Sequence, residues 1–184
     1  MEQPLCQLYD EHGQPLEGQG ATRDDVMSKG LLHSASHVWI WRRNNDIVEV
    51  LLQQRGADVR NYPGLLDISA AGHIDLGETP LQGALRETKE ELNLDIDVSD
   101  LRLFAVYRAH LQPSPGRYDN EFQWLYSLEV TDHEGFSLQE EEVDTTMWQP
   151  IDQFKDECSS DAYVPHSSAY YETVFYALER AASV

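Results

Sequence analysis

Apolar clusters separated by turn residues divide the first 54 residues into a hairpin and two longer strands. Residues 5–18 carry short apolar runs on either side of the turn residues DEHGQ, which predicts a β-hairpin. Residues 21–30 are polar and predict a loop or a short helix. Residues 31–42 and 47–54 are rich in β-branched and aromatic side chains and flank the turn RNND, so we predict a strand in each.

The strongest helical pattern of the chain lies at residues 79–92. Thr79 is a suitable N-cap, Pro80 suits the first helical position, and Gln82 completes a capping box. Side chains at spacings of three and four residues form one inward stripe, namely Leu81, Ala84, Leu85, Thr88 and Leu92. Asn93 then tolerates the left-handed conformation that ends many helices, so we predict that the helix ends there.

The remaining segments predict two more strands, a short strand and a second long helix. Residues 101–111 and 118–130 are predicted strands around the loop QPSPGR, and residues 136–150 hold an acidic loop and a short strand at TMWQ. Residues 61–71 begin with a Pro-Gly turn and end in small residues, where backbone can approach backbone. Residues 166–182 have the pattern of an amphipathic helix. Strands mixed with two or three helices predict a mixed α/β sandwich.

Length and composition indicate one globular domain that spans residues 1–184. A net charge of −20, from 13 basic and 33 acidic residues, argues against nucleic acid polymers and anionic membranes as partners. Cys6 and Cys158 show no metal-ligand or disulfide spacing, and the first residues show no signal peptide, so we expect a cytoplasmic protein. Because like charges repel, a protein this acidic needs a metal cation to bind a phosphorylated ligand.

Three glutamates on the predicted helix are the strongest candidates for chemistry. Glu87, Glu90 and Glu91 stand at positions i, i+3 and i+4, which places the three carboxylates together on what we expect to be the outer face. A solvated, Glu-rich helix face explains most such runs. The alternative is a divalent-metal site, because Mg²⁺ binds carboxylate oxygens and is completed by waters and substrate phosphates.

The spacing of the whole segment 72–94 favours the metal site. It has Gly72, five residues, Glu78, seven residues and then RETKEELNL, which resembles the signature of the Nudix hydrolases. Two positions depart from that signature: Thr88 replaces the usual aliphatic residue and Asn93 the usual glycine, and neither change touches a carboxylate. The resemblance implies a Nudix-type α/β/α sandwich with a mixed sheet and an N-terminal β-hairpin.

The resemblance also implies an activity and a set of site residues. The reaction is the Mg²⁺- or Mn²⁺-dependent hydrolysis of a diphosphate linkage in a nucleoside diphosphate derivative or a similar organic diphosphate. The implied metal ligands are Gly72, Glu87, Glu90 and Glu91, and the implied catalytic residues are Glu87, Glu91, Arg86 and Glu121. Arg86 is expected to orient a glutamate carboxylate, and the general base stays open between Glu87, Glu121 and the run 140–142. The partner is a small diphosphate, and a homodimer stays open beside a monomer.

Four segments resemble in particular the Nudix branch that includes the isopentenyl-diphosphate isomerases and their hydrolase relatives, namely residues 31–40, 62–78, 119–126 and 136–143. With the N-terminal hairpin the similarity covers about residues 5–155. Those isomerases carry a catalytic Cys immediately before the Gly-His of the motif, where this chain has Ala71, which favours a hydrolase. An isomerase of an allylic diphosphate and a non-catalytic nucleotide-binding module remain the alternatives. The positions that match the isomerase metal site are His33, His73, Asp119 and Glu121. Three roles stay open for these four residues: they bind a second metal, they contact the substrate, or they have a structural role alone.

Two further sets of residues have both a structural and a functional interpretation. Arg55, at the end of a predicted strand, binds a substrate phosphate together with His33 and His73, or forms a surface ion pair. The strand aromatics pack in the core, or one of them stacks on a base; they are Trp39, Trp41, Trp124 and Tyr126. The last thirty residues carry no motif that predicts a role.

Overall fold

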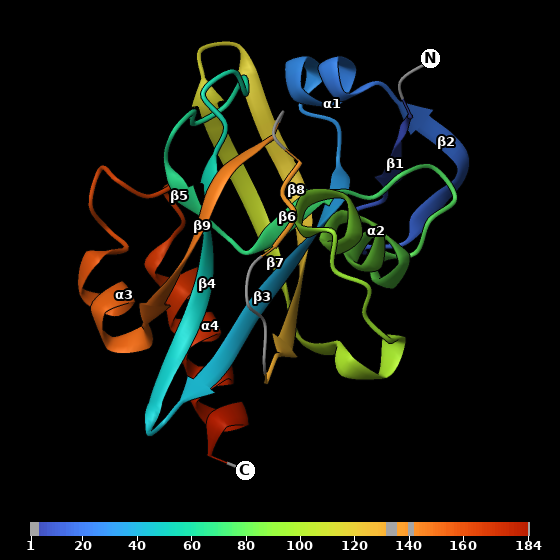
Figure 1. Ribbon diagram of the computed structural model, residues 1–184. Helices are drawn as coiled ribbons and strands as arrows, with labels where there is room; N and C mark the ends of the chain where they lie inside the picture. Colours follow the sequence, from blue (N-terminus) through green and yellow to red (C-terminus); the bar gives the residue numbers. More distant parts are fainter. Residues whose placement is uncertain (1–3, 132–135, 140–141, 184) are drawn as a thin grey trace.

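A seven-stranded mixed sheet forms the centre of the computed structural model, which describes residues 4–131, 136–139 and 142–183 (Figure 1). Its strands are β3 (His33–Asn44), β4 (Ile47–Arg55), β5 (Leu66–Asp67), β6 (Ala70–His73), β7 (Arg102–Ser114), β8 (Arg117–Glu129) and β9 (Val143–Pro150). The path runs β5-β4-β3-β8-β7, while β6 pairs with β3 and β9 pairs with β4. β3 and β8 are parallel and the other pairs are antiparallel, so the sheet is mixed as predicted.

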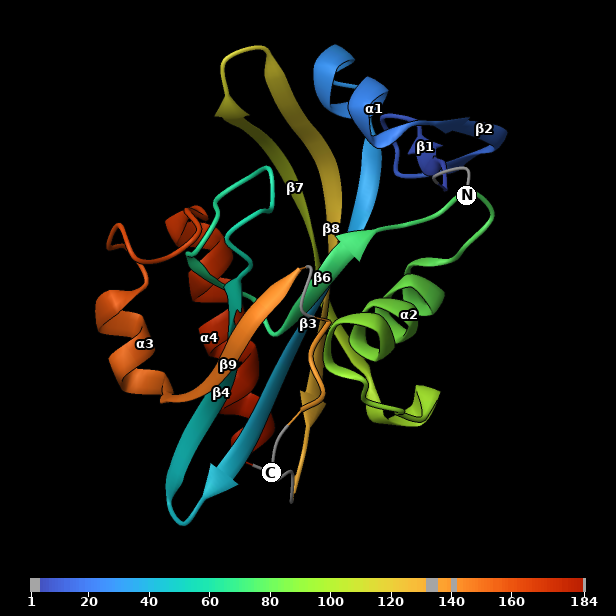
Figure 2. The same cartoon turned by 45° about the horizontal axis from the view of Figure 1, so that its top comes forward.

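Helices cover both faces of this sheet (Figure 2). One side carries α2 (Pro80–Leu92), followed by the short 3₁₀ helix Val98–Asp100, and the other carries α3 (Ile151–Glu157) and α4 (Ser168–Ala182). The N-terminal hairpin of β1 (Cys6–Tyr9) and β2 (Pro15–Ala21) leads into α1 (Arg23–Lys29). The predicted α/β/α sandwich with an N-terminal β-hairpin is therefore confirmed. No helix among the described residues has the length and apolarity to cross a membrane.

α2 begins and ends where the sequence predicts, and its caps explain why. The Thr79 hydroxyl accepts a hydrogen bond from the Gln82 backbone N–H, and the Gln82 side chain accepts one from the Thr79 N–H in return. Asn93 adopts the left-handed conformation, with φ 52° and ψ 33°, and its N–H bonds back into the last turn. Ala84, Thr88 and Leu92 of the predicted stripe are buried, and Leu81 and Leu85 pack against the same core cluster.

Three segments differ from the elements that the sequence predicts. The loop expected at 112–117 is mostly strand, because β7 and β8 continue into a tight turn at Gly116, where φ is +76°. Residues 61–71 contain β5 and the first two residues of β6, and both strands are too short to show a strand pattern. α3 was not predicted, since its seven residues bury only Ile151 and Phe154 and leave no helical stripe to detect.

The alternation of side chains along β3 separates two apolar clusters. Trp39 and Trp41 point into the cluster that contains α3 and α4, whereas Val38 and Ile40 point into the cluster on the α2 side. The four strand aromatics named above all pack in or against these clusters, so their core interpretation is the one the structure supports; Trp124 and Tyr126 belong to the α2 side.

One edge of β3 is shared by two strands, and this arrangement positions the site. Residues 35–38 of β3 pair with β6, while residues 41–44 pair with β4. Residues of both β4 and β6 line a cavity of about 390 Å³. Its wall also includes residues of α1, α2, β8 and the segment that precedes α4.

Candidate functional site

Two of the three α2 glutamates turn inward, toward the backbone of β6. Glu87 is 9% exposed and Glu91 is 3% exposed, whereas Glu90 is exposed. The Glu87 carboxylate lies directly beside Gly72, at a position where a side chain on residue 72 would stand. Glu91 Oε2 accepts a hydrogen bond of 3.1 Å from the backbone N–H of Ala71. The expectation of an outer helix face is therefore wrong for Glu87 and Glu91, because β6 passes along it.

Hydrogen bonds of Arg86 connect these acids to Glu78 and to the backbone of His73, near the start of the motif. Its Nε and Nη2 donate to the two oxygens of Glu78 at 2.9 and 3.0 Å, and Nη2 also donates to the His73 carbonyl at 2.9 Å. Its Nη1 donates to Glu87 at 2.6 Å and to Glu90 at 3.1 Å. Arg86 therefore contacts three glutamate carboxylates, which fits the orienting role expected of it, and its guanidinium lies at the edge of the cavity.

The raised pKa values of Glu87 and Glu91 are those expected of a cation site without its cation. Burial raises the pKa of Glu87 to about 7, although the neighbouring Arg86 opposes the shift. Burial also raises the pKa of Glu91 well above its ordinary value, and the charge of Glu87 adds to the effect. The charge of Glu142, which lines the same cavity, raises both values further. Because these carboxylates resist ionisation together, a divalent cation between them would stabilise the ionised state.

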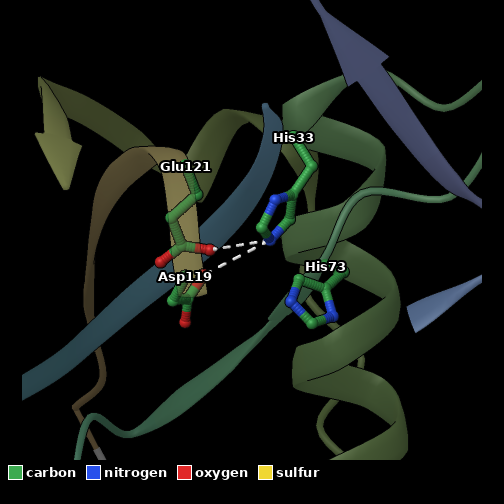
Figure 3. A group of neighbouring side chains, drawn as sticks. All are labelled: His33, His73, Asp119 and Glu121. Carbon is green, nitrogen blue, oxygen red and sulfur yellow. Dashed lines mark ion pairs between the residues drawn. The ribbon is translucent and has the colours of Figure 1, made fainter. Parts of the chain in front are cut away.

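A second polar cluster lies on β3, β6 and β8, and its members are His33, His73, Asp119 and Glu121 (Figure 3). Strand pairing brings them together, because Glu121 lies opposite His33 in the parallel register and His73 lies opposite Ala35. One ligand atom of each lies within 4.8 Å of all the others. His33 Nε2 is 3.4 Å from Asp119 Oδ1 and 3.5 Å from Glu121 Oε2.

The donor set of this second cluster suits a divalent metal ion. Two imidazole nitrogens and two carboxylates are common ligands of such ions. His33 Nε2 and Asp119 Oδ1 are buried without a hydrogen-bond partner among the described residues, which is costly unless another group binds them. Burial, together with the charge of Asp119, raises the pKa of Glu121 to about 8. Burial alone would raise the pKa of Asp119, but His33 beside it lowers that pKa below its ordinary value.

Arg55 lies in the cavity rather than on the open surface. Its Nη1 donates to Asp67 Oδ2 at 2.9 Å, and its Nε donates to the Asn61 carbonyl at 3.1 Å. The Asp67 side chain is almost fully buried, so the ion pair is not the surface pair that the sequence left open. Its Nη2 donates to none of the described residues, which leaves N–H groups of Arg55 available in the cavity.

Several residues of the cavity wall carry no signal in the sequence that assigns them to a site, namely Cys6, Arg23, Tyr62, Asp67 and His166. Each is a single residue on an element that reaches the cavity only through tertiary packing, so no local pattern marks it. Tyr62 has φ +52°, which is unusual for a bulky side chain but is visible only in the structure. Burial raises the pKa of the Cys6 thiol to about 11, which keeps it neutral. Of the acidic run, Glu142 lines the cavity, while residues 140 and 141 lie outside the described residues.

The burial of His37 predicts that the stability of the fold depends on pH. Burial, helped by the charge of His166, lowers the pKa of His37 from its ordinary 6.5 to about 3. Between pH 6.5 and pH 3, His37 is therefore protonated in the unfolded chain and neutral in the folded protein. The contribution of His37 to the free energy of unfolding is complete above pH 6.5 and is lost as the pH falls toward 3. We expect the free energy of unfolding to fall by up to ~1.4 kcal/mol per pH unit in this window because of His37.

Urea unfolding at several pH values, in EDTA, measures this effect. The His37→Gln variant should lose this part of the pH dependence while keeping the contributions of the other titrating groups. Equal slopes for the variant and the parent protein would contradict a buried neutral His37.

The comparisons with known proteins agree with this geometry. Residues 31–168 match the NUDIX domain family. Nudix hydrolase 3 of Arabidopsis thaliana is 34% identical over 155 residues, which make up 81% of this chain and 20% of that protein, so the chain spans about a fifth of this relative. An uncharacterized Nudix hydrolase of Listeria innocua is 32% identical over 144 residues, which cover 78% of this chain and 79% of the relative.

A solved structure shows the same fold over nearly the whole chain. The crystal structure of DR0079 from Deinococcus radiodurans has a TM-score of 0.69 at 16% identity and covers 96% of this chain and 98% of that chain. The family match begins before β3 and extends to the first residue of α4, so it includes α2 and both carboxylate clusters. The resemblance that the spacing of Gly72, Glu78 and the α2 glutamates indicated is confirmed, and the chain belongs to the Nudix hydrolase family.

Proposed function

We propose that the protein hydrolyses a diphosphate linkage in a nucleoside diphosphate derivative or a similar organic diphosphate, with Mg²⁺ or Mn²⁺ as cofactor. The observation that carries the proposal is the burial of two carboxylates, Glu87 and Glu91, in the cavity against the backbone of residues 71–72. Arg86 is the shared partner of Glu78, Glu87 and Glu90, and Glu91 is bonded to a backbone N–H, so the buried acids carry more negative charge than Arg86 neutralises. Such uncompensated burial is unfavourable, and membership of the Nudix hydrolase family supplies the reaction that would use a cation there.

The residues that would hold the cation are Gly72, through its carbonyl, and Glu87, Glu90 and Glu91, through their carboxylates. This is an all-oxygen set of the kind that Mg²⁺ prefers. When bound, the ion supplies charge neutralisation for the diphosphate and lowers the pKa of a coordinated water. Arg86 orients Glu87 and Glu90 in advance through its two hydrogen bonds, which is the role expected of a residue behind metal ligands.

The substrate phosphates would be bound by Arg55, His33 and His73. The N–H groups of Arg55 that remain unused can bond phosphate oxygens, while Asp67 fixes the guanidinium plane. His33 and His73 have their ring centroids 4.8 Å apart beside Asp119 and Glu121. The same four residues support a second divalent cation, and in that case they contact the diphosphate through it.

The general base stays open among three carboxylates of the cavity, namely Glu87, Glu121 and Glu142. Gln123 donates to Glu121 at 2.7 Å and so fixes the direction of that carboxylate. Glu142 stands close enough to affect the charge state of Glu87 and Glu91. The Gln variants of Glu121 and Glu142 separate these roles, because loss of a general base removes the acidic limb of the pH–rate profile.

The isomerase alternative is weakened by residue 71. Ala71 offers no acid or base, and its backbone N–H is already bonded to Glu91. Cys6 of the cavity wall belongs to β1, and burial raises the pKa of its thiol to about 11, which keeps it protonated at neutral pH. The cavity therefore holds no thiol base where the isomerases place one.

The test of the proposed function is a substrate panel with purified protein. The panel contains nucleoside di- and triphosphates, dinucleotides, sugar nucleotides, thiamine diphosphate and isopentenyl diphosphate, each with Mg²⁺ and with EDTA. Mg²⁺-dependent release of phosphate or a nucleoside monophosphate supports hydrolysis. An isomerised product without phosphate release would overturn it in favour of the isomerase, and binding without any turnover would favour a non-catalytic module.

Metal addition gives a prediction that does not depend on the substrate. Saturation with Mg²⁺ at about 100 times its dissociation constant stabilises the folded state by ~2.7 kcal/mol, which corresponds to a rise in Tm of roughly 5–10 °C for a chain of this size. We expect Glu87→Gln to lose most of this rise, with NaCl of equal ionic strength as the control. An unchanged rise in that variant, together with its loss in Glu121→Gln, would move the metal site to the second cluster.

A further inference from the structure

Four of the polar residues that line the cavity outside the two carboxylate clusters lie next to one another. They are His37, Gln53, Asp67 and His166, and we call them the β5-side group. Gln53 and Asp67 are opposite partners in the β4–β5 pair. His166 Nε2 lies 3.5 Å from Asp67 Oδ1, and the rings of His166 and His37 are 6.0 Å apart. The members are therefore neighbours, although they come from three strands and the segment before α4.

The ring of His166 is held rigidly by aromatic contacts. It stacks on Tyr170 with a centroid distance of 4.3 Å and an interplanar angle of 15°, and Tyr171 packs on it edge-on. Tyr171 is fixed in turn, because its hydroxyl donates to the Val164 carbonyl. The last thirty residues, which carried no readable motif, thus contribute a preoriented side chain to the cavity.

His37 is oriented by a chain of hydrogen bonds. Trp39 Nε1 donates to the Tyr170 hydroxyl at 3.2 Å, and that hydroxyl lies 2.7 Å from His37 Nδ1. Among the described residues His37 Nδ1 is the one acceptor within reach of the Tyr170 hydroxyl proton, so we assign that proton to this bond, which leaves the proton of the neutral imidazole on Nε2. His37 therefore presents an N–H donor from a fixed ring.

Two atoms of the β5-side group have unmet hydrogen-bonding capacity. Gln53 is 2% exposed, and its Oε1 is buried without a partner among the described residues. His166 Nε2 is in the same condition, since 3.5 Å to Asp67 is long for a hydrogen bond. Buried polar atoms without partners are rare in native proteins, and these two lie on the wall of a cavity that is large enough for a ligand.

We propose that the β5-side group binds a hydroxyl-bearing organic part of the diphosphate substrate, such as a ribosyl group. The inference rests on the proposed function and narrows its substrate class. Hydroxyl groups both donate and accept hydrogen bonds, so a hydroxyl-bearing group can serve the acceptor of Gln53 as well as the N–H donor of His37. An isoprenoid chain would leave these atoms unpaired and would pack against polar walls, so the group selects against it.

The test compares two diphosphates in variants of the β5-side group. Gln53→Met keeps the side-chain length without the amide, and His166→Phe keeps the stack on Tyr170 without the nitrogen atoms. His110→Phe, an exposed residue of β7 away from the cavity, is the matched control. The measured quantity is the ratio of kcat/KM for ADP-ribose to kcat/KM for isopentenyl diphosphate. We expect this ratio to fall at least ~10-fold in each cavity variant and to keep its parent value in the control.

The outcomes separate this inference from the proposed function. A ratio unchanged in folded Gln53→Met and His166→Phe overturns the inference and leaves the hydrolase intact. If the parent protein turns over neither compound, calorimetric binding of the same two compounds decides the inference, and the wider substrate panel decides the proposed function separately. Weaker binding of ADP-ribose relative to isopentenyl diphosphate in the cavity variants upholds it, and equal losses or none overturn it.

Discussion

Replacing Glu91 by glutamine is expected to lower Mg²⁺-dependent hydrolysis by at least ~10³-fold, because a metal ligand contributes several kcal/mol of transition-state stabilisation. Glutamine keeps the size of the side chain, and its amide oxygen can still accept the hydrogen bond that Ala71 donates to Glu91. The change therefore removes charge and leaves packing in place. Multiple-turnover kinetics on the best substrate of the panel measures the effect.

The same variant has a second expected result that a structural role would not give. Burial raises the pKa of Glu91 well above its ordinary value. An acid of this kind favours folding below its unfolded pKa and loses that contribution as pH rises toward its folded pKa. At neutral pH without metal, Glu91→Gln should therefore unfold at the same or a higher temperature than the parent protein. Glu17→Gln, on the exposed hairpin, is the control for both measurements.

A different pattern of results would contradict the metal-ligand role. If Glu91→Gln lowers the Tm of the metal-free protein strongly and activity falls only in proportion to the unfolded fraction, Glu91 serves the structure. If activity is retained in the folded variant, the cation is held elsewhere, and the cluster around His33 and Glu121 becomes the first candidate.

The parts of the fold that could be predicted are those encoded by neighbours in sequence. The caps of α2 depend on Thr79, Gln82 and Asn93, all within one helix, and they lie where predicted. The spacing of Glu87 and Glu91 also follows from one helix, but the side to which they point does not. That side depends on β6, whose four residues run along α2 only because they pair with β3.

The residues of the cavity are even harder to predict from neighbours in sequence. His33 and Glu121 are 88 residues apart in sequence and meet because β3 and β8 pair in parallel with these two residues opposite each other. Only the family resemblance, and no local pattern, predicted their proximity. His166 and Asp67 had neither signal, since one precedes a helix and the other lies on a two-residue strand. Without a family resemblance, residues that meet through long-range packing are identified only by the structure.

Gly72→Ala is expected to lower Mg²⁺-dependent hydrolysis by roughly 10²-fold, because it displaces Glu87 and not because it strains the backbone. A Cβ on residue 72 would stand 2.0 Å from Glu87 Oε1 and 2.1 Å from its Cδ. The backbone of Gly72 has no positive φ, so alanine fits the strand conformation. The carboxylate must therefore leave the cavity wall, and its 2.6 Å hydrogen bond to Arg86 is lost or displaced.

A double-mutant cycle isolates this cause. In the Glu87→Ala background the space beside residue 72 is empty, so adding Gly72→Ala should change activity by less than about 3-fold. Similar losses from Gly72→Ala in both backgrounds would show that the glycine acts independently of Glu87, for example through its carbonyl. Strong coupling would show instead that the glycine of the motif is required because the carboxylate of Glu87 occupies the volume that any other residue would fill.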